Sequence, residues 1–98
     1  MGMTYTDSYE TRKAVSDMTI GEVKYKWEYI ATSPIDGRAY EVNATAYRLD
    51  GEQSVRLGYG SYAKGNSNVR FDTAGNVSVE VQAALSGQFY ADLVVLIS

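Results

Sequence analysis

The stretch that decides the fold is residues 23–31, which read Val-Lys-Tyr-Lys-Trp-Glu-Tyr-Ile-Ala. Its odd positions carry apolar or aromatic side chains, and most of its even positions carry charged ones. A period of two is typical of a β-strand with one face on the core and the other in water. The stretch therefore predicts a half-buried strand.

The same alternation continues along the chain, in short runs separated by turn residues. The runs cover residues 39–49, 54–63, 69–71, 77–83 and 89–97, and the turns fall at 33–38, 50–51, 64–67, 73–76 and 86–87. Short direct links favour antiparallel neighbours, because a parallel crossover needs a dozen or more residues. We expect an all-β fold: an antiparallel sandwich or flattened barrel of about six to seven strands, mostly connected by hairpins.

The alternation also predicts which side chains form the core. Tyr29, Tyr40 and Tyr59 are expected on inward faces, although a one-residue slip over 39–49 would exchange Tyr40 and Tyr47 and turn Val42 outward. The expected core is Val23, Tyr25, Trp27, Val42, Val55, Leu57, Val79, Val81, Leu93 and Val95.

Residues 1–18 do not follow one period. An acidic segment at Asp7–Glu10 resembles a helix start, whereas the tyrosines, threonines and Val15 favour a strand. The segment is therefore an N-terminal arm, a short helix or an extra strand, and residues 19–98 are expected to form a single β domain.

Composition excludes several functions. The 98 residues include no His and no Cys, so a Ser-His-Asp triad, a thiolate nucleophile and the usual zinc ligands are all missing. The net charge of −3 disfavours nucleic acid as a partner. A signal peptide or membrane span is not expected, and the localisation is undetermined. We expect no enzyme activity, no cofactor and no metal.

The glycine pattern at Gly58-Tyr59-Gly60-Ser61-Tyr62-Ala63 resembles a dinucleotide fingerprint only formally. That fingerprint needs a helix after the glycines, and the period of two continues here instead. The expected role of Gly58 and Gly60 is to clear space on one face of a strand, either for a neighbouring ring or for a bend.

The last run is apolar on both of its faces. Phe89, Leu93 and Ile97 alternate with Tyr90, Val94 and Leu96. A short chain can hardly cover both faces, so Tyr90, Val94 and Leu96 are the candidate interface of a homo-oligomer. The leading interpretation is a non-catalytic structural or assembly subunit, such as a virion component or surface module.

A second interpretation uses the nine tyrosines. Tyr47, Tyr62 and Tyr90 are expected on outward faces. Exposed tyrosines among Ser, Gly and Asn are typical of binding surfaces. The alternative function is thus a β-sandwich binding module that recognises a carbohydrate or a protein partner through these rings.

Overall fold

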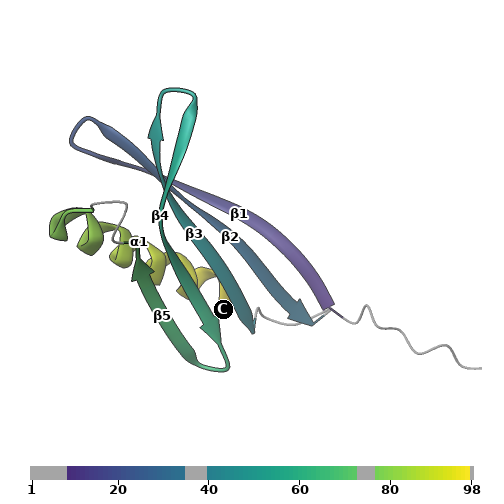
Figure 1. Ribbon diagram of the computed structural model, residues 1–98. Coiled ribbons are helices and arrows are strands. Elements are labelled where there is room, and N and C mark those ends of the chain that lie inside the picture. The colour runs from purple at the N-terminus through teal and green to yellow at the C-terminus, as the bar shows by residue number, and fades with distance from the viewer. Residues whose placement is uncertain (1–8, 35–39, 73–76, 98) are drawn as a thin grey trace, which may run out of the picture.

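A computed structural model describes residues 9–34, 40–72 and 77–97 of the chain. Over these residues it contains one antiparallel sheet in the order β1-β2-β3-β4-β5 and one helix that lies across a face of that sheet (Figure 1). The elements are β1 (Tyr9–Ile20), β2 (Val23–Pro34), β3 (Glu41–Asp50), β4 (Gln53–Ala63), β5 (Asn66–Phe71) and α1 (Val79–Ile97).

Tight turns set the register of the hairpins. Gly51 follows Asp50 with a φ of 64°, and the pair Lys64-Gly65 has φ values of 52° and 85°. Two consecutive positive φ values match the right-handed twist of the flanking strands. The turns predicted at 50–51 and 64–67 are found at Gly51-Glu52 and Lys64-Gly65, with Asn66 and Ser67 already in β5. Most of 33–38 and all of 73–76 lie outside the described residues.

The core lies between the sheet and α1. On β2 and β3 the alternation holds, since Tyr25, Trp27 and Tyr29 are buried on the face that bears the helix and Lys24, Lys26 and Glu28 point away from it. This face also contains Val42, so the inward face of 39–49 is the predicted one. The core is completed by Ala31, Ala44, Ala46, Leu57, Leu85, Phe89 and Leu93.

The C-terminal residues are the largest correction. The two strands and the turn predicted over 77–97 are wrong, because residues 79–97 form the helix α1. Val81, Leu85, Phe89 and Leu93 recur every four residues, and a spacing of four fits both a strand period of two and the stripe of a helix. Alternation alone could not separate the two structures.

This helix also explains why the strand count and the second sheet are not confirmed. The described residues form five strands in one open sheet, and α1 supplies the cover that a second sheet would give a sandwich. The mainly β character is confirmed. Residues 9–18, for which a helix, a strand and an arm were open, belong to β1.

A β-bulge changes the faces of β4. Ala46 pairs with Gly58 and Tyr47 with Arg56, so Leu57 is the extra residue. Leu57 and Gly58 are consecutive and both buried, and the side chains beyond them change faces. Tyr59, predicted inward, is therefore exposed on the side away from α1.

Other predicted core residues lie at the margins. Tyr40, just before β3, is exposed, and so is Val23 at the β1–β2 turn. Val79 and Val95 are exposed on α1, because a helix does not keep every odd residue on one side. Val55 and Val81 are half-buried against the core. In the described ranges no helix is long and apolar enough to cross a membrane.

Candidate functional site

Helix α1 begins at a side-chain cap. The Ser78 hydroxyl accepts a hydrogen bond from the Val81 N–H at 3.3 Å, as an N-cap residue does. Gln82 Nε2 donates to the Val77 carbonyl oxygen at 2.9 Å. Glu80 adds a carboxylate in the first turn, where the helix dipole favours negative charge. These contacts favour a helix from Val79 onward.

Two buried side chains of β2 fix how α1 is rotated about its axis. Trp27 Nε1 donates to the Leu85 carbonyl oxygen at 2.8 Å, and Tyr29 Oη donates to Asp92 Oδ2 at 2.6 Å. Asp92 Oδ1 also accepts from Gln88 Nε2 at 2.8 Å. The acceptors are two turns apart on the helix, so they determine which side chains point away from the sheet.

The Tyr29–Asp92 contact predicts a loss of stability at alkaline pH. Burial, then the hydrogen bond to Asp92 and its negative charge, raise the pKa of Tyr29 far above its ordinary value of about 10. In the unfolded chain Tyr29 ionises near pH 10, whereas in the folded chain it stays protonated to higher pH. The contribution of neutral Tyr29 to the free energy of unfolding is therefore complete below about pH 10 and falls as the pH rises further.

The variant Tyr29→Phe tests the predicted loss of stability at alkaline pH. Its free energy of unfolding should be lower than that of the wild type by about 1–2 kcal/mol at neutral pH, since the hydrogen bond is lost. Its stability should then fall less steeply than the wild type's above about pH 10. Urea unfolding from neutral to strongly alkaline pH measures both, and parallel curves for the two proteins above pH 10 would contradict the assignment.

The side of α1 away from the sheet is the candidate site, and it is called the outer face here. It is made up of Val79, Ala83, Gly87, Tyr90, Ala91, Val94 and Val95, all of them exposed. Val95 lies at its margin, where it also lines a hollow with Ala14 and Ser16 of β1. The exposed fractions are 79% for Val79, 44% for Tyr90, 64% for Val94 and 73% for Val95. Glu80 is the one charged residue near it within α1, because Asp92 is turned to Tyr29.

The predicted interface residues separate into two groups. Tyr90 and Val94 lie on the outer face, whereas Leu96 is half-buried and packs against the core. Sequence reasoning placed Val79 and Val95 in the core and Gly87 in a turn, and so missed their place beside Tyr90 and Val94. Their spacing of four was the signal that could have shown a common helical side.

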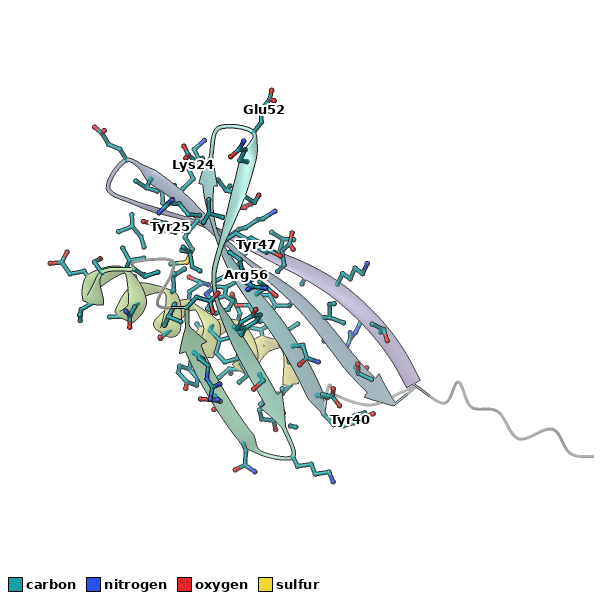
Figure 2. The ribbon with its side chains drawn as sticks, in the orientation of Figure 1. Lys24, Tyr25, Tyr40, Tyr47, Glu52 and Arg56 are labelled. Carbon is teal, nitrogen blue, oxygen red and sulfur yellow. The ribbon has the colours of Figure 1, made fainter. Side chains whose placement is uncertain are left out.

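The three predicted binding tyrosines do not share a surface. Tyr90 is on the outer face, and Tyr62 is half-buried on the side of β4 that faces α1. Tyr47 lies on the opposite side of the sheet, next to Arg56 of β4 (Figure 2). They therefore do not form one aromatic platform.

The open side of the sheet holds a groove of about 370 Å³ over β1, β2 and β3. Val15 and Ile30 give it apolar walls, and Asn43 and Tyr47 give it polar groups. Its carboxylate, Glu28, is 2.9 Å from Lys26 Nζ. Such a lining could hold a small polar ligand, but the groove lacks the paired carboxylates of a glycosidase among the residues that the structure describes.

Two of the cations on this side of the sheet have aromatic neighbours. Lys26 Nζ lies 5.3 Å from the centre of the Tyr47 ring, and Arg56 lies 4.9 Å from that of Tyr59. Arg56 also contacts Asp72 at 3.3 Å. This side thus carries charges of both signs among polar and apolar groups, whereas the outer face of α1 is apolar along most of its length.

Comparison with known proteins adds no relative: no family model, curated protein or solved structure matches the chain.

Proposed function

We propose that this protein is a non-catalytic assembly subunit whose copies associate through the outer face of α1. One observation carries the proposal: α1 packs Leu85, Phe89 and Leu93 on the sheet and still exposes Val79, Val94 and Val95 on its other side. A helix that is apolar all round is typically covered on both sides. Contiguous exposed apolar area marks interaction sites.

A second copy of the chain is the occupant that this surface favours. A partner of opposite charge would need charged groups to recognise, and the outer face between Ala83 and Ile97 has none, with Asp92 held by Tyr29. An apolar surface is complementary to itself, and most soluble oligomers pair identical patches. The chain's lack of His and Cys supports a role without catalysis.

The size of the outer face sets the expected strength of association. A helix of 19 residues is about 28 Å long and about 10 Å wide, so a helix pair covers a few hundred Å² on each copy. Stable interfaces usually bury about 800 Å² on each partner. We therefore expect a concentration-dependent dimer rather than a permanent one.

Val94→Asp tests the proposal. It places a charge in the contact, and we expect the dissociation constant to rise at least about ten-fold, equivalent to about 1.4 kcal/mol. Folding should be unaffected, because Val94 is exposed in the single subunit. Light scattering behind a sizing column, over a wide range of protein concentration, measures the change.

Val15→Asp is the matched control. Val15 is also an exposed valine (57%), but it lies on β1 on the open side of the sheet. The Val15→Asp substitution should therefore leave the dimer intact. A wild-type chain that stays monomeric at every concentration would refute self-association. A dimer lost in Val15→Asp and kept in Val94→Asp would move the contact to the sheet.

A further inference from the structure

The outer face has an order that reads the same in both directions. Its central row, taken every four residues, is Val79, Ala83, Gly87, Ala91 and Val95. Large side chains stand at both ends, small ones lie between them, and Gly87 is the centre. Each of these residues is exposed. A symmetric row presents the same surface to a second copy that runs in the opposite direction.

The contacts within a single subunit give no reason for a glycine at position 87 of the helix. Gly87 lies opposite the buried Leu85 and Phe89, and a Cβ added to it would meet nothing within 4 Å. Glycine within a helix is less favourable than alanine. No feature of the described subunit uses its missing side chain, but a helix that approaches closely at this point would.

On the basis of the proposed self-association, we infer that two copies pair α1 with α1, antiparallel, about a two-fold axis at Gly87. Each residue then faces the one equally far beyond the centre, so Ala83 faces Ala91 of the partner subunit. Val79 likewise faces Val95 of the partner subunit. Rows spaced by four are inclined to the helix axis, and two such rows align when the axes cross at about 50°.

The rest of the outer face fits this arrangement. The two Tyr90 side chains lie on the same side of the pair, flanking the central row. Glu80 and Val94 are each seven residues from Gly87, so Glu80 faces Val94 of the partner subunit near the end of the contact, where crossed helices diverge and the carboxylate reaches water. Val94→Asp therefore places a second carboxylate opposite Glu80 of the partner subunit. Antiparallel helices also oppose their dipoles favourably.

Single cysteines test the pairing, since the chain has none of its own. Gly87→Cys should form a disulfide-linked dimer on mild oxidation, because the two residues meet at the axis. Ala83→Cys and Ala91→Cys should each remain unlinked alone, since their copies are about 12 Å apart along the helices and a disulfide needs Cα atoms within about 7 Å. Their equimolar mixture should link, and mass spectrometry of the products identifies the pairs.

The outcomes separate this inference from the function on which it rests. Ser61→Cys, exposed on β4 away from α1, is the control for random linking. If Ala83→Cys or Ala91→Cys forms a linked dimer alone, the antiparallel axis at Gly87 is wrong. The axis is also wrong if none of the cysteine variants links although the wild type dimerises and Val94→Asp dissociates that dimer. A wild-type monomer would instead refute the assembly itself.

Gly87→Ala provides a second measurement. It should weaken the dimer about ten-fold, because a methyl group separates the helices at the axis. In the monomeric Val94→Asp background it should raise the unfolding midpoint by a few degrees, since alanine is the better helix former. If Gly87→Ala raises the stability and yet dimerises as strongly as the wild type, the two helices do not approach closely at Gly87.

Discussion

Replacing Phe89 by alanine should lower the free energy of unfolding by about 3–5 kcal/mol, as is usual for a buried aromatic side chain. Phe89 is fully buried, with its ring centre 5.3 Å from that of Trp27 and 6.2 Å from that of Tyr29. It is the central contact between α1 and the sheet. A domain of this length is stable by about 5–15 kcal/mol in total, so the variant would be partly unfolded at modest urea concentrations.

The chain has its own reporter for this experiment. Trp27 is the single tryptophan, and it is fully buried beneath α1. Urea unfolding followed by its fluorescence gives the free energy directly, and a red shift before unfolding would show that the helix has left the sheet. Tyr59→Ala is the control, because this ring is exposed on the side of the sheet away from α1 and its loss should cost no more than about 1 kcal/mol. Equal effects of the two substitutions would contradict the packing described.

The buried face of the sheet was predictable because its pattern has one explanation. Between residues 23 and 31, aromatic side chains alternate with charged ones, which no helix could sort onto two sides. Tyr25 and Trp27 are accordingly buried, and so is Val42 on the neighbouring strand. The turns with glycine at 50–51 and 64–67 have similarly direct physical causes.

The helix was not predictable from alternation, because Leu85, Phe89 and Leu93 satisfy both periods. The competing signals were local: Ser78 as an N-cap, Glu80 in the first turn, and the strong helix formers that follow. The bulge at Leu57 was likewise hidden, since an extra residue reverses the faces of a strand without changing its composition.

The candidate site could be predicted in part, despite the wrong secondary structure. Tyr90 and Val94 follow the buried Phe89 and Leu93 directly, and the next residue leaves the buried side in a strand and in a helix alike. Leu96 differs because it lies seven residues after Phe89, two helical turns, and so returns toward the core. The self-symmetric row could be recognised only once the helix was known.

Gly60→Ala should destabilise the protein by about 1–3 kcal/mol, the usual cost of extra volume in a packed core. A Cβ on Gly60 would lie 2.5 Å from Cε1 of Phe89, far inside contact distance. The ring cannot easily retreat, because Trp27 and Tyr29 pack against it. Gly60 thus does clear space for a ring, as its position in the sequence predicts, but the ring comes from the helix.

A double-mutant cycle shows whether this contact is the cause. In the Phe89→Leu background the rigid ring is gone, and Gly60→Ala should then be nearly neutral or stabilising, since alanine suits a strand better than glycine does. The two substitutions should therefore couple by at least about 1 kcal/mol, measured by urea unfolding of all four proteins. Strictly additive effects would mean that the helix and β4 do not meet at Gly60. Coupling would place α1 on the sheet in the orientation that leaves Gly87 and Val94 facing away from it.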